Sequence, residues 1–474
     1  MKNNRRDFIK MTGLASVGLI GGCSSQAKNG EPAAQIHQQK FNMSGYAAPK
    51  LDIVRMAVIG IGNRGSSQVR NLASIEGVEI KALCDLLPER VAKGIESIKP
   101  FGHNPDSYSG SEDEWKKICD RKDIDLVYIS TPWPLHTPIA MYAMEHDIHV
   151  ATDRPAAKTI EDCWRLVETS EKTRKHCWIS THGCFSGMGA VTLNMVRQGF
   201  FGELIHGEGG YIHDRMERVY DHSYGTWRFK ENATRNGNLY PDSAVDCISQ
   251  MMDINCGDKM DFLSSLSSND FMMGKKAKES GYKDELGKSY DNNTFRGNIN
   301  LTIIKTNKGR SIMIQHDVTS PRPRPKTHDL ISGTKSICLW SVPAIGVAGS
   351  HEWLPDEEVK ALEEKYKPEM TKRFTEVCKQ AGRSVDSGVS EEEWRLIDCL
   401  RNGIPMDTSV YDAALYASIG PLTEWSVANK SNSIAIPDFT CGSWKTNPRG
   451  MDINLEKGGG NTKLLSLLKD KPLG

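Results

Sequence analysis

The chain has 474 residues, of which 38% are hydrophobic and 25% are charged, a composition typical of a globular protein with a sizeable core. Lysine plus arginine and aspartate plus glutamate each number 60, so the chain lacks the basic excess that nucleic-acid binding requires. At this length we expect two domains preceded by an export segment, and no apolar run reaches the ~18 residues of a membrane-spanning helix.

The first 23 residues have the order of features found in an exported lipoprotein. Arg5 and Arg6 precede a weakly apolar stretch that ends in Leu-Ile-Gly-Gly and Cys23. This order resembles a twin-arginine signal followed by a lipoprotein acylation site. We predict export and a lipid anchor on Cys23, so that the protein faces the periplasm or lies on the outer membrane. The alternative is an ordinary amphipathic first helix. Residues 24–50 are polar and aperiodic, which predicts a linker.

The twelve cysteines show no CxxC pair and no Cys/His spacing typical of a metal site. Apart from Cys23 we expect most of them to be small buried hydrophobic side chains. We predict no metal site.

A strand at residues 54–59 leads into a glycine-rich turn with Gly60, Gly62 and Gly65. A helix follows to about residue 72, and a second strand at 78–85 ends in Asp85. In this context glycines let the backbone approach a pyrophosphate, and the helix N-terminus offers free N–H groups. An acid about twenty residues after the turn can bond the ribose hydroxyls. The pattern predicts NAD, because Asp85 would repel a 2′-phosphate; a glycine-rich turn with a surface aspartate is the alternative.

The α/β alternation continues with strands at 125–130 and 148–152, separated by a helix at about 138–145. Ligands of such sheets lie at the carboxyl ends of the strands. We therefore place Trp133, His136 and Asp153 near the cofactor, although His136 is equally well explained as a helix-cap or surface histidine. The sequence predicts a doubly wound Rossmann domain over residues 51–189.

After about residue 185 the pattern changes to longer alternating segments at 202–214, 294–305 and 311–318. These predict a second, α+β domain over residues 190–445 with a mostly antiparallel open sheet. Residues 446–474 read as a C-terminal extension. The fold class is therefore α/β with two domains.

Several motifs resemble the Gfo/Idh/MocA oxidoreductase superfamily, and within it glycoside hydrolase family 109. The superfamily motifs are GIGNRG at 60–65, TPWPLH at 131–136 and DRP at 153–155. The motifs similar to family 109 are CWRLV at 163–167, GELIHGEG at 202–209, RNGNLYP at 235–241 and TSPRP at 319–323.

The resemblance implies an unusual hydrolysis, typified by release of α-linked N-acetylgalactosamine. Tightly held NAD oxidises the sugar C3 hydroxyl, a base removes the acidified C2 proton, the aglycone leaves, water adds and the hydride returns. The residues implied in NAD binding are Gly60, Gly62, Asn63, Arg64, Gly65, Asp85, Trp133, Pro134, Leu135, His136, Asp153, Arg154 and His182. Those implied in sugar binding are Tyr211, Arg228, Tyr240, Pro241, Asp242, Ser243 and Arg324.

This chain departs from the family pattern around the sugar. Asp153 replaces a glutamate, His182 and Phe185 replace an asparagine and a tyrosine, and Arg324 replaces a tyrosine. Asp242-Ser243-Ala244 stands where the family shows Thr-His-Gly, so its histidine is absent and a substrate other than an α-N-acetylgalactosaminide is implied.

Because the family's histidine is absent, another residue must transfer the proton. Three residues are candidates for this role: His182, Asp242 and Asp246. Histidine has an ordinary pKa suited to proton transfer at neutral pH. Asp242 and Asp246 are four residues apart and share one face of a helix, where a carboxylate pair would raise one pKa. Alternatively, Asp242 caps the helix and Asp246 is solvated beside it.

Three functions remain open. The chain is an NAD-dependent glycosidase, a sugar oxidoreductase that releases an oxidised sugar, or a catalytically silent sugar-binding lipoprotein that retains NAD. In each case the partner is a glycan or glycoside, the membrane is reached only through the lipid, and the superfamily resemblance implies a homo-oligomer.

Overall fold

The structure is a computed structural model. It describes residues 37–181, 183–185, 187–222, 226–284, 286–290, 295–322, 329–386 and 388–466. The predictions for the signal and for Cys23, His182 and Arg324 fall outside these residues. From His37 onward the chain belongs to one compact unit.

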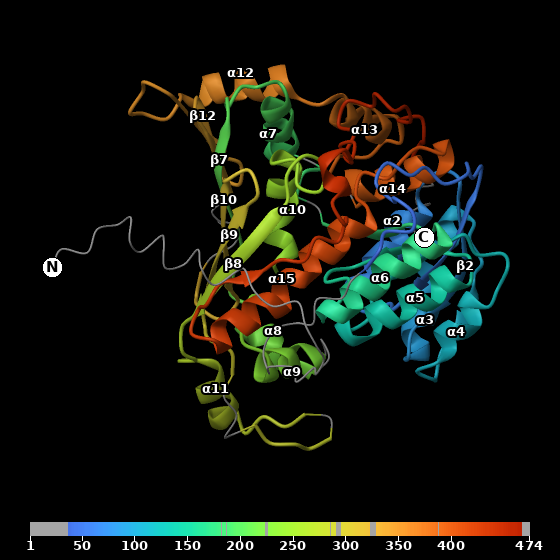
Figure 1. The fold of residues 1–474 in the computed structure, drawn as a ribbon. Coiled ribbons are helices and arrows are strands. Elements are labelled where there is room, and N and C mark those ends of the chain that lie inside the picture. The colour runs from blue at the N-terminus through green and yellow to red at the C-terminus, as the bar shows by residue number, and fades with distance from the viewer. Residues whose placement is uncertain are drawn as a thin grey trace, which may run out of the picture. The chain divides into compact units, whose positions relative to one another are not determined.

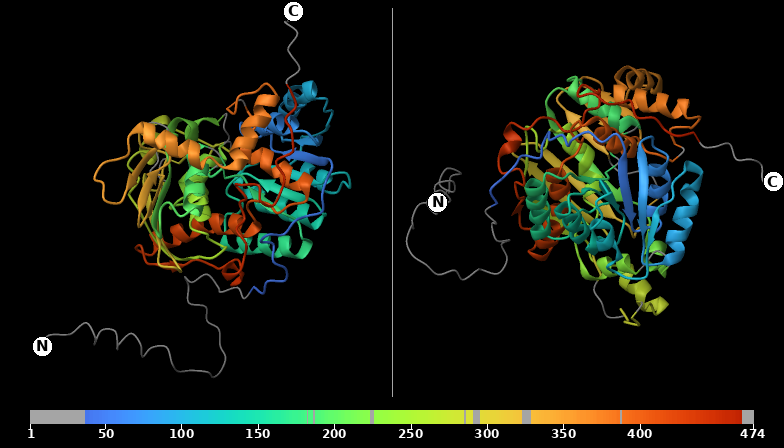
Figure 2. Two further views of the ribbon diagram at one scale, coloured as in Figure 1. Left: turned by 90° about the horizontal axis from the view of Figure 1, so that it is seen from above. Right: turned by 90° about the vertical axis from the view of Figure 1, so that its right-hand side faces the viewer.

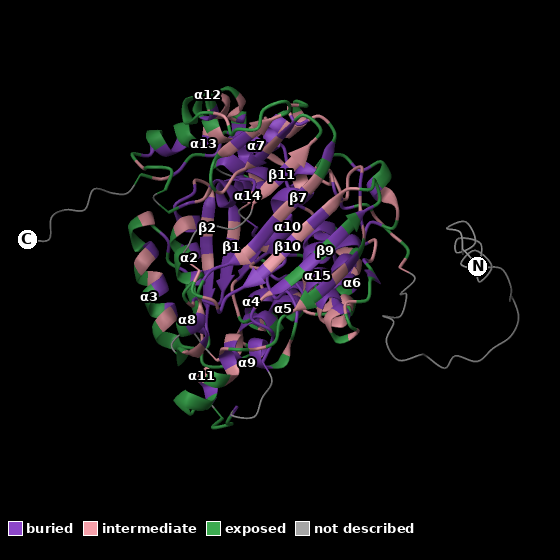
Figure 3. Cartoon of the chain, turned by 90° about the vertical axis from the view of Figure 1, so that its left-hand side faces the viewer, coloured by how far each residue is buried: buried purple, intermediate pink, exposed green. Residues whose placement is uncertain are grey.

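The first sheet is a six-stranded parallel sheet with the order β3-β2-β1-β4-β5-β6. This is the strand order of a dinucleotide-binding Rossmann domain. Its strands are β1 (Val54–Ile59), β2 (Val78–Cys84), β3 (Asp106–Tyr108), β4 (Leu126–Ile129), β5 (His149–Thr152) and β6 (Cys177–Ile179). β1 and β4 are almost wholly buried, as the continuous apolar runs of the sequence predict for a sheet covered on both faces (Figure 3).

Helices alternate with these strands and flank the sheet (Figure 1, Figure 2). They are α2 (Gly65–Ala73), α3 (Pro88–Ile98), α4 (Glu114–Cys119), α5 (His136–Glu145) and α6 (Ile160–Thr173), with short 3-10 turns at Lys99–Phe101 and Trp133–Leu135. The predicted Rossmann fold is confirmed.

The second sheet has eight strands in the order β13-β12-β11-β7-β10-β9-β8-β14. Every neighbouring pair is antiparallel except β7 and β10, which confirms the predicted mostly antiparallel sheet. Its strands are β7 (Leu204–Ile212), β8 (Met260–Ser267), β9 (Asn300–Thr306), β10 (Ser311–Asp317), β11 (Leu330–Gly333), β12 (Ser336–Leu339), β13 (Ala344–Val347) and β14 (Ile434–Ala435).

The remaining helices are α7 (Gly187–Arg197), α8 (Met216–Tyr220), α9 (Trp227–Thr234), α10 (Asp242–Met251), α11 (Met273–Ser280), α12 (Asp356–Tyr366), α13 (Glu369–Gln380), α14 (Glu391–Asn402) and α15 (Val410–Ala428). Of these, α10 and α15 pack on the second sheet, whereas α14 packs on α2 and β1 of the Rossmann domain and α13 packs on α14. α15 packs against both β8 and α6 and so joins the two halves (Figure 1). No helix in the described ranges is long and apolar enough to cross a bilayer.

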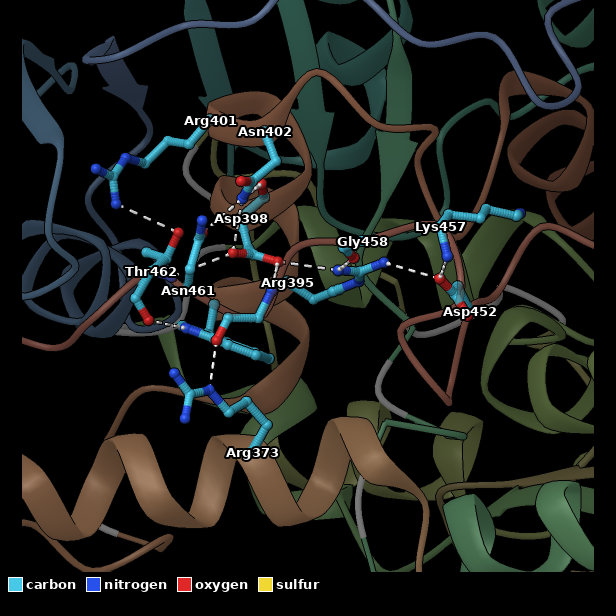
Figure 4. Close-up of polar contacts among 12 residues, drawn as sticks. Arg373, Arg395, Asp398, Arg401, Asn402, Asp452, Lys457, Gly458, Asn461 and Thr462 are labelled. Carbon is cyan, nitrogen blue, oxygen red and sulfur yellow. Dashed lines mark hydrogen bonds and ion pairs between the residues drawn. The ribbon is translucent and has the colours of Figure 1, made fainter.

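Both ends of the described chain are tied to the core. Residues 37–50 belong to the predicted linker, and there the backbone N–H of Met43 donates to the Tyr411 hydroxyl. In the predicted C-terminal extension, Gly460 N–H and Thr462 N–H donate to Asp398, which also pairs with the buried Arg395 at 2.9 Å (Figure 4). These stretches are therefore part of the folded unit.

Candidate active site

The glycine turn between β1 and α2 leaves room for a ligand at only one of its three glycines. A Cβ on Gly60, whose φ is +90°, would lie 2.7 Å from Ser130 backbone, and one on Gly65 would lie 1.8 Å from the Gly60 oxygen. Gly62 is different, because its Cβ would meet only an Arg90 nitrogen at 3.8 Å. Arg64, the N-cap of α2, makes no side-chain capping bond. The open backbone at Gly62, next to the start of α2, forms a cradle that fits a pyrophosphate.

Asp85, directly after β2, is buried and holds this turn. Its carboxylate accepts hydrogen bonds from the N–H groups of Ile61 at 2.7 Å and Leu87 at 3.0 Å, and Arg90 lies 3.6 Å away. An ionised carboxylate has lone pairs for further donors, so it can also accept from ribose hydroxyls. The predicted acid is therefore placed at the end of the strand beside the glycine turn.

Asp153, directly after β5, is the centre of a second polar group. Its carboxylate accepts from the hydroxyls of Tyr128 at 3.0 Å and Ser130 at 2.5 Å, and from Arg64 Nε at 3.4 Å. Arg64 thus extends from the glycine turn to the end of β5. The predicted residues Arg64 and Asp153 meet at the carboxyl edge of the sheet.

Arg154 connects the Rossmann domain to the second domain. Its Nη1 donates to the Thr181 carbonyl oxygen at 2.8 Å and to Ser243 Oγ at 3.0 Å. Ser243 lies in the first turn of α10, so one guanidinium links the loop after β6 with the helix that carries Asp242 and Asp246.

His136 is buried, and both of its ring nitrogens lie 2.8 Å from carbonyl oxygens, of Pro155 and Thr131. It braces the loops that follow β4 and β5. That His136 also contacts the cofactor stays a prediction. Pro134 and Leu135 form the 3-10 turn that leads into α5.

An aromatic cluster of Trp133, Tyr211, Trp227 and Tyr240 joins the two domains. The ring of Trp133, after β4, lies 5.0 Å from the rings of both Trp227 and Tyr240. Tyr211 on β7 stacks on Tyr240 at 4.3 Å, and Arg228 Nε donates to the Tyr240 hydroxyl at 3.0 Å. The sequence therefore identified Tyr211, Arg228 and Tyr240 as residues that the fold brings together, whereas it assigned Trp133 to the cofactor alone.

Asp242 and Asp246 lie on α10 and are both buried. Asp246 accepts hydrogen bonds from the N–H groups of Gly183 at 2.9 Å and Cys247 at 2.6 Å. Neither carboxylate oxygen of Asp242 has a hydrogen-bond partner in the described part of the chain. The alternative prediction, a capping Asp242 with a solvated Asp246, is wrong, because α10 begins at Asp242 without a side-chain cap and burial encloses both carboxylates.

Burial changes the titration of this pair. It raises the pKa of Asp242 to about 6 and that of Asp246 to about 7, against the opposing attraction of Arg154. Carboxyl groups titrating this close to neutrality can take up and return protons. A buried carboxylate without a hydrogen-bond partner also costs free energy unless a ligand supplies one.

Sequence reasoning missed the residues that hold this pair in place. Cys184 and Cys247 form a disulfide, although most cysteines were expected to be simple buried side chains. Glu392, on α14, accepts the Thr181 N–H at 2.5 Å. Cys184 and Cys247 are 63 positions apart, and Thr181 and Glu392 are 211 positions apart, so no local sequence pattern links either pair. Only the position of Cys247 next to Asp246 could have drawn attention to the disulfide.

Two families of known proteins account for nearly the whole unit. Residues 54–181 match the oxidoreductase family with an NAD-binding Rossmann fold, and residues 188–446 match the glycosyl hydrolase 109 C-terminal domain. The chain belongs to glycosyl hydrolase family 109. A family 109 protein of Shewanella pealeana is 39% identical over 461 residues, covering 94% of this chain and 98% of that relative. One of Shewanella putrefaciens is 38% identical over 460 residues, covering 93% and 97%.

Solved structures share the fold of this family 109 member at low sequence identity. Levoglucosan dehydrogenase in complex with NADH and levoglucosan has a TM-score of 0.58 and 16% identity, covering 81% of this chain and 99% of that structure. Myo-inositol dehydrogenase from Lactobacillus casei with NAD(H) and myo-inositol gives 0.53 and 14%, covering 82% and 99%.

The cofactor of this family 109 chain is NAD. The open backbone at Gly62, the uncapped start of α2 and the acid at Asp85 fit its pyrophosphate and ribose, as predicted. Trp133 and Asp153 lie at the neighbouring strand ends, where such a sheet receives its ligand.

Proposed function

We propose that the protein hydrolyses glycosides by transient oxidation at sugar C3, elimination across C2 and C1, and addition of water. At a coarser level, the family and the NAD-binding domain make it an NAD-dependent enzyme that acts on sugars. The observation that carries the finer proposal is the buried pair Asp242 and Asp246, which lies beside Arg154 of the Rossmann domain.

The aromatic cluster suits a sugar ring. Aromatic faces pack against the C–H groups of a sugar, while hydroxyl and guanidinium groups at the edge bind its oxygens. Trp133 and Trp227 supply such faces, and Tyr240 with Arg228 supplies the polar edge. Because Trp133 follows β4, a sugar on this cluster would lie next to the cofactor edge of the Rossmann sheet.

The carboxylates provide the proton transfers. When bound, NAD supplies the hydride acceptor and donor at sugar C3. Asp246, with a pKa of about 7, is our candidate for the base that removes the C2 proton and returns it after water has added. Asp242, with a pKa of about 6 and no hydrogen-bond partner, is placed to accept a sugar hydroxyl. His182 remains a further candidate for proton transfer.

The first experiment screens aryl α- and β-glycosides of several sugars with the purified, NAD-containing protein. Release of the nitrophenol and absorbance at the NADH wavelength are followed together. The proposal predicts sustained aglycone release without net NADH, because the hydride returns within each turnover. N-Acetylgalactosaminides are included but are not expected to be the best substrates, given the changes at Asp153 and Asp242.

The same assay separates the two competing functions. A sugar oxidoreductase would accumulate NADH and oxidised sugar in proportion and would leave the glycosidic bond intact. A silent sugar-binding protein would bind sugars, without aglycone release from any member of the panel. Either result would overturn the proposed hydrolysis.

We also propose that the protein is exported and anchored by a lipid on Cys23. The support is the order of the arginine pair, apolar stretch and cysteine in residues 1–23. In cells that express the full chain, Cys23→Ser should move the protein from the membrane to the soluble exported fraction. Replacing Arg5 and Arg6 by lysine should retain it in the cytoplasm. Unchanged fractionation of both variants would contradict the proposal.

A further inference from the structure

A cavity of about 640 Å³ lies between α2 and α3, on the outer side of the Rossmann domain. One wall is a face of α2, the other is a face of α3, and the loop between α13 and α14 closes one end. Besides the basic residues described below, its lining includes Ile61, Ser66, Ser67, Ser97 and Gly388. The aromatic cluster and the Asp242–Asp246 pair contribute nothing to it.

The lining of this α2–α3 groove is cationic. It contains Arg70, Arg90, Lys93 and Arg383, and no aspartate or glutamate. Within the described ranges only Arg90 of these four has a carboxylate within 4.0 Å, namely Asp85 at 3.6 Å. The groove therefore concentrates positive charge that no carboxylate of its lining neutralises.

Arg383 differs from the other three because two of its donors are buried without a partner in the described ranges. Its Nη1 donates to Ser74 Oγ at 2.8 Å, and its guanidinium lies 5.7 Å from the centre of the Phe101 ring. Its Nε and Nη2 are buried and have no hydrogen-bond partner among the described residues. Burial and the nearby charge of Arg70 both lower the pKa of Arg383, so the folded protein holds two like charges close together.

Buried, unpartnered guanidinium donors next to a second cation destabilise the folded protein unless an anion binds to them. Buried N–H donors without acceptors lose their hydration without compensation, and a charged donor loses most. A tetrahedral oxyanion offers the acceptor pairs that a guanidinium fork matches. Ser66, Ser67 and Ser97 add hydroxyl groups along the same groove, which suit the hydroxyls of a carbohydrate-like scaffold.

We propose that the α2–α3 groove is a binding site for a ligand that carries a sulfate or phosphate group on a hydroxyl-rich scaffold. Arg383 and Arg70 bind the oxyanion, and Lys93 with the serines binds the scaffold. The site is separate from the sugar site of the proposed function and stands without it. Ile61 and Arg90 border both the groove and the glycine turn, so the groove lies next to the NAD site. If the two sites are distinct, the anion binds while NAD is bound.

The test uses the NAD-containing full-length protein and isothermal titration calorimetry. Sodium sulfate and sodium phosphate are the first probes, at an ionic strength held constant with sodium chloride. We expect saturable binding in the millimolar range and a dissociation constant at least tenfold higher in Arg383→Gln. The exposed Arg70→Gln should weaken binding in the same direction. Arg165→Gln, which removes the same charge from α6, is the control and should leave binding unchanged.

Two further ligands identify the source of the oxyanion. Tighter binding of galactose 6-sulfate than of sulfate, with AMP no tighter than phosphate, would assign a sulfated sugar; the reverse order would assign a nucleotide. The proposal is overturned if wild type and both groove variants bind sulfate and phosphate equally, or if either anion displaces NAD, since the groove would then belong to the cofactor site. Arg70 is exposed, so Arg70→Gln should keep the wild-type melting temperature. A thermal unfolding measurement of this variant then shows that the weaker binding is not caused by loss of folding.

Discussion

At the scale of single residues, the buried Asp246 is the most informative group in the molecule. Two backbone N–H groups, of Gly183 and Cys247, fix its carboxylate, yet burial still raises its pKa to about 7. A group held rigidly and titrating near neutrality has the properties of a general base. Its neighbour Asp242 is equally buried but has no such donors. We infer that a substrate hydroxyl donates a hydrogen bond to Asp242.

We expect Asp246→Asn to lower kcat by about 10²–10⁴-fold, the range typical for loss of a general base, while NAD binding is retained. The amide keeps the shape of the carboxylate but cannot take up the proton. Asp261→Asn, on the exposed part of β8, removes the same charge elsewhere and serves as the control. Steady-state kinetics on the best aryl glycoside measure both, and an Asp246→Asn enzyme with wild-type kcat would exclude this residue as the base.

Stability should depend on pH through the same residue. Because the folded protein raises the pKa of Asp246 from its usual value near 4 to about 7, the neutral form is favoured by folding. This contribution is present at low pH and is lost as the pH rises through about 7. The melting temperature should therefore fall between pH 5 and pH 8 by less in Asp246→Asn than in wild type. Parallel curves for the two proteins would contradict the assigned burial effect.

The sequence could predict that Asp242 and Asp246 share a helix face, because a spacing of four is a local property. It could not predict their burial, the N–H of Gly183 on Asp246 or the disulfide beside it. These depend on contacts between positions about sixty residues apart. The contacts of His136 show the same limit, since its two carbonyl partners come from different loops and could not be predicted from the sequence.

At the scale of elements, the β1–α2 turn could be predicted almost completely. Strand, glycine spacing, helix and acid are all local features, and β1, α2 and β2 occupy the predicted ranges. The short strands β11 to β13 gave no separate signal, because four residues are too few to show a periodicity, and the pairing of β11 with β7 is non-local.

The turn offers a matched pair of glycine substitutions. Gly62→Ala meets only the Arg90 side chain, so the fold should be retained while NAD affinity falls by tenfold or more, because the methyl group occupies the pyrophosphate cradle. Gly65→Ala would place a Cβ 1.8 Å from the Gly60 oxygen and should destabilise the domain itself. Thermal unfolding and NAD titration distinguish the two effects; unchanged NAD affinity in Gly62→Ala would argue against the cradle.

The Cys184–Cys247 disulfide connects the loop after β6 to α10. The disulfide adjoins both N–H donors of Asp246. Cys184 follows the first donor, Gly183, in sequence, and Cys247 is itself the second donor. We expect Cys184→Ser to lower kcat and to shift the acid limb of the pH profile, with little change in NAD affinity. Cys378→Ser, at a buried free cysteine on α13, is the matched control. An unchanged pH profile would show that the disulfide does not position Asp246.

At the scale of the whole molecule, the second sheet has one face packed on helices and one open face. The open face carries exposed apolar side chains on three strands, Ile205 on β7, Phe262 and Leu266 on β8, and Leu301 and Ile303 on β9. Leu266 and Leu301 are direct cross-strand neighbours, and exposed apolar side chains clustered in this way are typical of an interaction surface. We propose this face as the contact surface of the homo-oligomer that the superfamily resemblance implies.

We expect the purified protein to sediment as a dimer or larger oligomer and Ile303→Asp to shift it towards the monomer. Ile303 is 59% exposed in the single chain, so a charge there does not disturb the core but would be buried in a sheet-to-sheet contact. Thr334→Asp, on the turn between β11 and β12, is the control. Sedimentation velocity measures the oligomeric state of both variants and of the wild type. A monomeric wild type would show that the open face of the sheet is not an oligomer interface.

In the proposed reaction NAD is reduced and reoxidised within each hydrolytic cycle, and the carboxylate pair moves the C2 proton. Hydrolysis of the best aryl glycoside in deuterium oxide, with NMR of the released sugar, tests this reaction. We predict aglycone release together with deuterium at C2 and no net NADH. Aglycone release with C2 still fully protonated would contradict it, because elimination across C2 and C1 could not then have occurred.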